Sequence, residues 1–131
     1  MIVDSSAVVA ILRKEPEEDD FRRWISGANP ARLSAANYLE VGIVIDKPGD
    51  PAAIRSVDDF MLRSGIVIEP VTERQARIAR EAYRDYGKAS GHPARLNFGD
   101  CFAYALARDL GEPLLFKGDD FRHTDIRPAI P

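Results

Sequence analysis

The stretch Met1-Ile2-Val3-Asp4-Ser5-Ser6-Ala7 sets an apolar run, an acid and two serines in direct succession. The apolar residues predict a short buried strand, because β-branched side chains favour strands and no polar residue interrupts them. Serines commonly begin helices, so we expect a helix over residues 5–14. A strand that ends in an acid and leads into a helix indicates an α/β sheet, in which ligands bind beyond the C-terminal ends of the strands.

The alternation of apolar runs and helical patterns continues along the chain. Further strands are predicted over residues 31–34, 66–69 and 114–116, and a last short one over residues 126–130. Helices are predicted over residues 35–45, 51–63, 72–89 and 100–110, and another begins within residues 15–18. Helices that connect parallel strands cover both faces of the sheet. The expected fold is therefore α/β, with a central, mostly parallel β-sheet flanked by helices on both faces.

The length and composition are those of a globular domain. The chain has 131 residues, 45% of them hydrophobic and 30% charged, which predicts one domain over residues 1–131. Its 18 basic and 21 acidic residues give a net charge of -3, so the global charge gives no support for nucleic-acid binding. Cys101 is the single cysteine, which fits a reducing cytoplasm. No apolar run approaches the roughly 18 residues of a membrane helix, so we expect no membrane association.

Several acidic residues stand out by their positions. Asp4 ends the first predicted strand, and Asp119 follows the strand over residues 114–116. Asp100 opens a predicted helix, and Glu40 lies inside one. These acids are too far apart along the chain for a local binding loop, so only the fold can gather them. Most have a structural explanation as well, because Asp can cap a helix or occupy a turn, and Asp120 shares the turn with Asp119.

Glu40 is harder to explain by structure alone. Its neighbours on the predicted helix face, at positions 36, 37, 43 and 44, are mostly apolar. A buried carboxylate without a partner is costly or takes up a proton, so Glu40 requires an arginine or a metal ion. An oxygen-only set of acids suits Mg²⁺ or Mn²⁺ better than zinc. Such a site activates water and neutralises a scissile phosphate, which indicates phosphodiester hydrolysis.

Four blocks of the sequence resemble the PIN-domain proteins, and most closely the VapC-type ribonuclease toxins of bacterial toxin–antitoxin pairs. The blocks are residues 1–7 quoted above, Ser34-Ala35-Ala36-Asn37-Tyr38-Leu39-Glu40, Leu96-Asn97-Phe98-Gly99-Asp100-Cys101-Phe102-Ala103-Tyr104-Ala105 and Leu114-Leu115-Phe116-Lys117-Gly118-Asp119-Asp120-Phe121. They span the whole chain in the family's order.

This resemblance implies a cytoplasmic endoribonuclease that depends on Mg²⁺ or Mn²⁺. By matching positions, the catalytic and metal-binding acids are Asp4, Glu40, Asp100 and Asp119. Ser6 matches a small hydroxyl residue that supports the site. Asp120 is an alternative fourth acid, but Asp119 is preferred because it follows the strand more directly. The resemblance also implies inhibition by a VapB-like antitoxin and assembly as a homodimer.

The remaining candidate residues carry less information. Lys88 and Arg95 lie in a loop before Asp100 and are candidates for contacts with RNA phosphates, although a solvated loop explains them equally well. Cys101 is expected in the core, and the two histidines, His92 and His123, are expected in loops.

Two other functions stay open from the residues alone. Aspartyl phosphatases of the haloacid-dehalogenase type also begin with a strand that ends in Asp, but they require a second Asp where Ser6 stands. A binding module in which the acids only cap helices predicts no metal binding and no cleavage. Glu40 argues against that module, because a helix cap does not explain it.

Overall fold

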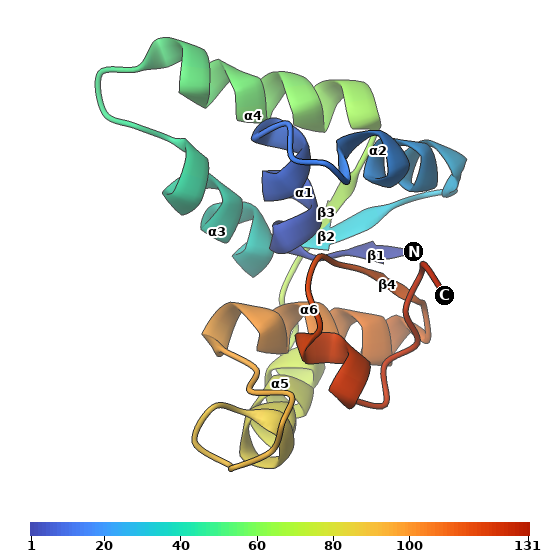
Figure 1. Cartoon of the computed structure of the whole chain (residues 1–131). Coiled ribbons are helices and arrows are strands. Elements are labelled where there is room, and N and C mark those ends of the chain that lie inside the picture. The colour runs from blue at the N-terminus through green and yellow to red at the C-terminus, as the bar shows by residue number, and fades with distance from the viewer.

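The protein is a parallel β-sheet between two layers of helices, in a computed structural model that describes residues 1–131 (Figure 1). The four strands have the order β3-β2-β1-β4, and all neighbouring pairs are parallel. The strands are β1 (Ile2–Val3), β2 (Arg32–Ser34), β3 (Val67–Glu69) and β4 (Leu114–Leu115). The helices are α1 (Ser5–Leu12), α2 (Glu18–Gly27), α3 (Ala35–Ile45), α4 (Pro51–Ser64), α5 (Glu73–Tyr86), α6 (Phe98–Leu110) and the 3₁₀ helix η1 (Asp120–His123). The α/β class expected from the sequence is confirmed.

Alternate residues of the central strands build the cores on the two faces of the sheet. Ile2 and Leu114 are fully buried in a cluster with α5 and α6. Their neighbours Val3 and Leu115 belong to a second cluster, with α1, α2 and α4. Figure 1 shows the first group of helices below the sheet and the second group above it. Because successive strand residues point to opposite faces, strands of two residues contribute to both cores.

Side-chain caps fix the starts of several helices, and two of these starts differ from the sequence prediction. Asp4 accepts a hydrogen bond from the Ser6 amide at 3.0 Å and caps α1, so neither serine is the cap. Asn97 caps α6 and accepts from the Asp100 amide at 2.8 Å, so this helix begins before Asp100. Thr72 caps α5, and that helix ends at Tyr86 rather than at the predicted residue 89. In each case a side-chain oxygen satisfies an amide that has no partner inside the helix.

Two further expectations are wrong. Residues 126–130 form no strand and contribute only an isolated bridge between Leu114 and Pro128, since proline has no amide to donate to a ladder. The helix α3 is not buried as its apolar composition suggested, because Ile43 is 72% exposed while Asn37 is fully buried. This helix contacts α1, α4 and α6 along one side and leaves its outer side open. No helix is both long and apolar enough to span a bilayer.

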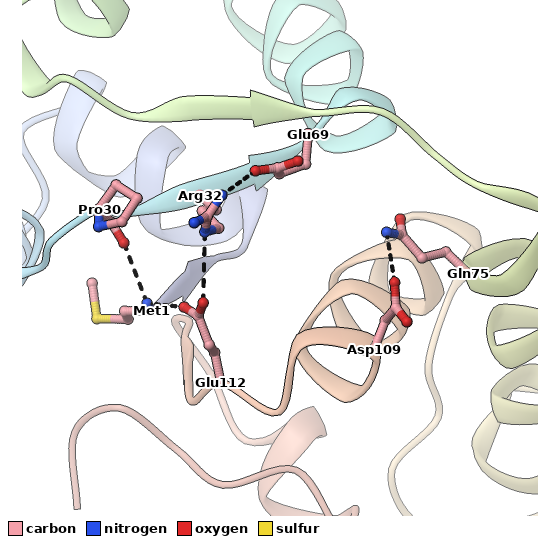
Figure 2. Close-up of polar contacts among 7 residues, drawn as sticks. All are labelled: Met1, Pro30, Arg32, Glu69, Gln75, Asp109 and Glu112. Atoms are coloured by element: carbon pink, nitrogen blue, oxygen red, sulfur yellow. Dashed lines mark hydrogen bonds and ion pairs between the residues drawn. The ribbon is translucent and has the colours of Figure 1, made fainter.

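Charged side chains near the start of β2 are compensated by one another (Figure 2). Arg32 forms an ion pair with Glu69 of β3, and its Nε lies 3.5 Å from Oε1 of Glu112, which precedes β4. Gln75 of α5 donates to Asp109 of α6 at 3.1 Å. The acids in this part of the molecule therefore have cationic or amide partners, and they join the sheet to α6 and α6 to α5.

Candidate active site and metal centre

Acids from four different elements gather beyond the C-terminal end of β1. Asp4 follows that strand, Glu40 comes from α3, Asp100 from the first turn of α6, and Asp120 from η1. The charges of the other three all act on the carboxyl of Asp100. The fold thus brings together residues separated by most of the chain, at the position where open α/β sheets bind ligands.

Asp4 has one oxygen in use and one without a partner. Its Oδ2 accepts from the Ser6 amide, which is the cap of α1. Its Oδ1 is buried and has no hydrogen-bond partner. Burial, opposed by hydrogen bonds from Ser6 and reinforced by the charge of Glu40, raises the pKa of Asp4 to about 6. A buried carboxylate oxygen without a partner is costly, so this atom calls for a cation or a proton.

Glu40 is held by neutral groups rather than by an arginine. The Ser5 hydroxyl and the Asn37 amide both donate to its Oε1, the latter at 3.2 Å. Asn37 also donates to the carbonyl of Gly99 at 2.9 Å and so joins α3 to α6. The expectation that Glu40 sits on a buried apolar face is wrong, since the side chain is half-buried. Of the two partners expected from the sequence, an arginine or a metal ion, the arginine is absent, because Glu40 forms no ion pair and its donors are Ser5 and Asn37.

Gly99 is in close contact with the carboxylate of Glu40. A Cβ atom at this position would lie 1.9 Å from Oε2 of Glu40 and 2.5 Å from its Cδ. Any side chain here would therefore displace the carboxylate. Gly99, Ser5 and Asn37 were not among the site residues predicted from the sequence. The signals were present, since Gly99 directly precedes Asp100 and Asn37 lies one helical turn before Glu40.

Asp100 is the third residue of α6 and takes part in its capping box. Its Oδ2 accepts from the Asn97 amide at 2.9 Å. Burial, followed by the negative charges of Asp4, Asp120 and Glu40, raises the pKa of Asp100 to about 7. The structural explanation of Asp100 as a helix cap is therefore partly right, but capping leaves its second oxygen without a hydrogen bond.

The charge of Asp120, rather than that of Asp119, acts on the carboxyl of Asp100, although both residues are exposed. The side chain of Asp119 is 86% exposed, and its one ion pair is with Arg122 at 3.9 Å. Asp120 is among the charges that raise the pKa of Asp100, after burial, whereas Asp119 is not. Ser6 supports this loop, because its Oγ accepts from the Lys117 amide at 3.0 Å.

The donor set fits a hard divalent cation. Asp4, Glu40 and Asp100 each have one oxygen fixed by a protein donor and the other without a hydrogen bond. None of these acids, nor Asp120, takes part in an ion pair with a lysine or arginine. Oxygen ligands of this kind suit Mg²⁺ or Mn²⁺. No three side chains are already arranged as ligands of one ion, so binding requires side-chain rotation.

The other residues considered from the sequence lie outside this cluster. Lys88 and Arg95 are exposed in the loop between α5 and α6. Cys101 is buried, and burial followed by the charge of Asp100 raises the pKa of its thiol to about 11, so it is not a nucleophile at neutral pH. His92 lies in the same loop, where its Nδ1 accepts from the Ala94 amide.

This fold and this acid cluster define a PIN domain. The family model described as "PIN domain" matches residues 1–127, and the chain belongs to that family. Ribonuclease VapC28 of Mycobacterium tuberculosis is 55% identical over 130 residues, which cover 99% of this chain and 98% of that protein. Ribonuclease VapC42 of the same species is 50% identical over 129 residues, covering 98% of each chain. The chain is thus a VapC-type ribonuclease, the toxin class of toxin–antitoxin pairs.

Solved structures share the fold at low sequence identity. Mycobacterium tuberculosis VapC20, a sarcin–ricin loop cleaving toxin, superposes with a TM-score of 0.73 at 19% identity and covers 95% of both chains. FitAcB from Neisseria gonorrhoeae superposes with a TM-score of 0.70 at 17% identity, covering 97% of this chain and 94% of that one. At these identities the likeness concerns the fold. PIN-domain ribonucleases depend on a divalent metal, which agrees with the donor set described above.

Proposed function

We propose that the chain hydrolyses RNA phosphodiester bonds at this acid cluster, with Mg²⁺ or Mn²⁺ held by Asp4, Glu40, Asp100 and Asp120. The observation that carries the proposal is the uncompensated negative charge around the buried Oδ1 of Asp4. Asp120 replaces Asp119, the fourth acid preferred from the sequence, because the charge of Asp120 acts on Asp100 whereas Asp119 pairs with Arg122.

Two groups of residues would build the metal site: the acids that hold the cation and the donors that orient those acids. Ser5 and Asn37 fix one oxygen of Glu40, and the Ser6 and Asn97 amides do the same for Asp4 and Asp100. Protein donors that orient ligands in this way commonly contribute 10- to 100-fold to metal affinity or activity. When bound by these acids, a divalent cation would neutralise charge at the scissile phosphate and lower the pKa of an attacking water. Because burial raises the pKa of Asp100 to about 7 and that of Asp4 to about 6, cation binding is expected to strengthen as the pH rises.

Cleavage of a single-stranded RNA by the purified protein, in chelator, Mg²⁺ and Mn²⁺, tests the proposal. Cleavage is expected with either cation and not with chelator. Asp120→Asn is expected to reduce the rate at least about tenfold, since it removes a charge beside Asp100. Asp119→Asn serves as the matched control and is expected to change the rate little, because this side chain lies in solvent.

Equal cleavage in chelator and in Mg²⁺ would contradict the metal-dependent reaction. A larger loss in Asp119→Asn than in Asp120→Asn would return the fourth position to Asp119. Hydrolysis of a phosphomonoester in the absence of RNA cleavage would favour the aspartyl-phosphatase alternative, in which Asp4 is the nucleophile.

VapC toxins pair with antitoxins, and we propose a VapB-like antitoxin for this chain. A guanidinium pairs bidentately with carboxylates, so an antitoxin arginine placed among Asp4, Glu40 and Asp100 would block the site. Replacing that arginine is expected to weaken inhibition of RNA cleavage more than it weakens binding measured by calorimetry. A complex that leaves these acids accessible and active would contradict this mechanism.

We also expect the protein to be a cytoplasmic homodimer. Light scattering measures its mass in solution.

A further inference from the structure

A groove with a volume of about 620 Å³ lies between α5 and α6, beside the acid cluster. The residues that line it include three with aromatic rings and three with polar side chains: Tyr83, Phe98, Phe102, Arg80, Lys88 and Asn97. Phe98 is the first residue of α6 and directly precedes Gly99 and Asp100. The groove and the acid cluster therefore share one helical turn.

One aromatic side chain of this groove, that of Phe98, is unusually accessible. Phe98 is 79% exposed, although a residue of this kind contributes most to stability when it is buried. Its ring meets the Phe102 ring edge to face, with centroids 4.9 Å apart. Phe98 is thus an exposed ring positioned by a partly buried one. An exposed aromatic surface next to a catalytic cluster is typical of a binding site.

The polar side chains of the groove carry donor groups that have no partners inside the protein. Arg74, Arg77 and Arg84 on α5 form ion pairs with acids, whereas Arg80 on the same helix does not. Lys88 likewise forms no ion pair. Asn97 uses its oxygen to cap α6, and its Nδ2 donates to no group of the protein. The groove therefore offers two positive charges and an amide donor around an apolar surface.

We propose that this groove, hereafter the base groove, binds a nucleobase of single-stranded RNA adjacent to the scissile phosphate. In this proposal the base stacks on the ring of Phe98. Arg80 and Lys88 contact the neighbouring phosphates, and the side-chain amide of Asn97 donates a hydrogen bond to the edge of the base. This inference rests on the proposed function, since it assumes an RNA substrate at the acid cluster. Recognition of single strands by aromatic stacking and flanking cations has this chemistry.

A second copy of the chain fits the base groove less well than RNA does. In a twofold interface the same patch occurs on both copies, so unpaired cations on one copy would lie near those of the other. Neither Arg80 nor Lys88 forms an ion pair with an acidic residue that would relieve this repulsion. Phosphates, in contrast, neutralise both cations directly.

The test combines variants of Phe98 with RNA substrates that lack single bases. An oligoribonucleotide that the wild type cleaves is prepared in a series, each member carrying one abasic ribose near the cleaved bond. Base–aromatic stacking predicts that one abasic position lowers kcat/KM of the wild type by about 5- to 150-fold. Phe98→Leu, which keeps the apolar bulk, is expected to lower kcat/KM on the intact substrate similarly and to abolish the penalty at that position. Phe98→Trp is expected to retain the penalty.

Leu62→Ala provides the control for loss of an exposed apolar side chain, because Leu62 is 83% exposed on α4. It is expected to leave both kcat/KM and the abasic penalty unchanged. An abasic penalty that persists in Phe98→Leu would overturn the proposal, and so would a fall in oligomeric mass in that variant without any change in the abasic pattern. If the wild type cleaves no RNA with Mg²⁺ or Mn²⁺, the proposed function itself fails, and this result is distinguishable from the others.

The salt dependence of RNA affinity tests the cationic part of the base groove. Each phosphate contact to a single strand contributes about 0.7 to the slope of log affinity against log salt. Arg80→Gln and Lys88→Gln are each expected to reduce that slope by about this amount. Arg77→Gln, one turn away and ion-paired with Glu73, is the matched control and is expected to leave the slope unchanged. Equal effects of Arg77→Gln and Arg80→Gln would overturn the assignment of Arg80.

Discussion

Asp100→Asn is expected to reduce the rate of RNA cleavage at least about a hundredfold. This loss is larger than the loss expected when the replaced residue only orients a metal ligand. Asp100 lies where the charges of Asp4, Glu40 and Asp120 meet, so its carboxylate is the centre of the proposed cation site. The substitution leaves an oxygen that can still accept from the Asn97 amide, so the capping box of α6 is retained. Far-UV circular dichroism and cleavage rates in Mg²⁺ and Mn²⁺ measure the two effects separately.

The same variant is expected to stabilise the protein when no metal is bound. Burial first, and then the neighbouring acids, raise the pKa of Asp100 to about 7, and Asp4 has a pKa of about 6 for similar reasons. An unfolded Asp has a pKa of about 3.9, so the native state binds more protons between about pH 4 and pH 7. The free energy of unfolding of the metal-free wild type therefore increases as the pH falls through this window.

Thermal unfolding in chelator at pH 8 and pH 5 measures this stabilisation. The wild type is expected to melt higher at pH 5, and Asp100→Asn is expected to melt about 5 °C above the wild type at pH 8, the shift for roughly 1 kcal/mol in a domain of this size. Most of that advantage should disappear at pH 5, where Asp100 of the wild type is protonated.

Asp109→Asn is the matched control for the Asp100 variant. Asp109 lies on the same helix but forms an ion pair with Arg74, so its charge is already compensated. Asp109→Asn is expected to retain cleavage and not to raise the melting temperature at pH 8. Full cleavage by a folded Asp100→Asn protein would contradict the central role given to Asp100.

The strand and the acid of the first block were predictable from the sequence because they depend on local patterns. Ile2 and Val3 are apolar, β-branched and followed by an acid, and the structure buries both before Asp4 caps α1. Parallel strands then follow from their alternation with helices. The chain order of these elements was therefore sufficient to place Asp4 at the C-terminal end of a strand, whereas Asp100 was assigned to the same site only through the family resemblance.

The choice between Asp119 and Asp120 depended on geometry that sequence spacing does not determine. Gly118 has a positive φ of 96°, so the chain turns sharply just before the two acids. After this turn Asp119 projects into solvent and Asp120 begins η1. Distance from the preceding strand, on which the preference for Asp119 was based, takes no account of such a turn.

The contacts that Ser5 and Asn37 make in the site were not predicted, for a different reason. Their contacts join elements far apart along the chain, Ser5 to Glu40 and Asn37 to Gly99. Serine near a helix start is usually explained as a cap, and the position of Asn37 one turn before Glu40 does not by itself show that the two side chains are hydrogen-bonded. Only the packing of α3 against α1 and α6 gives these side chains their partners.

Gly99→Ala is expected to reduce RNA cleavage at least about tenfold without destabilising the protein. The added Cβ would lie 1.9 Å from Oε2 of Glu40, far below any contact distance, so the carboxylate must move. The atoms in its way are the far end of a flexible side chain rather than backbone, so the fold can accommodate the change. Alanine also favours a helix over glycine by up to about 1 kcal/mol, which supports unchanged or higher stability.

Gly27→Ala is the control for the general effect of replacing glycine by alanine in a helix. Gly27 ends α2, and nothing lies within 4 Å of a Cβ built there. This variant is expected to retain the cleavage rate and the metal affinity of the wild type. A comparable loss of cleavage in Gly27→Ala would show that the effect at Gly99 is not specific to the site.

A double-variant cycle with Glu40 identifies the path by which Gly99 acts. If the methyl group acts only by displacing the Glu40 carboxylate, Gly99→Ala should cost much less activity in a Glu40→Ala background than in the wild type, because the two changes share one interaction. Calorimetric titration with Mn²⁺ gives a readout independent of cleavage, and Gly99→Ala and Glu40→Ala should weaken binding by similar factors. Additive losses in the cycle, or unchanged Mn²⁺ affinity in Gly99→Ala, would show that Gly99 acts on RNA or on α6 instead of on Glu40.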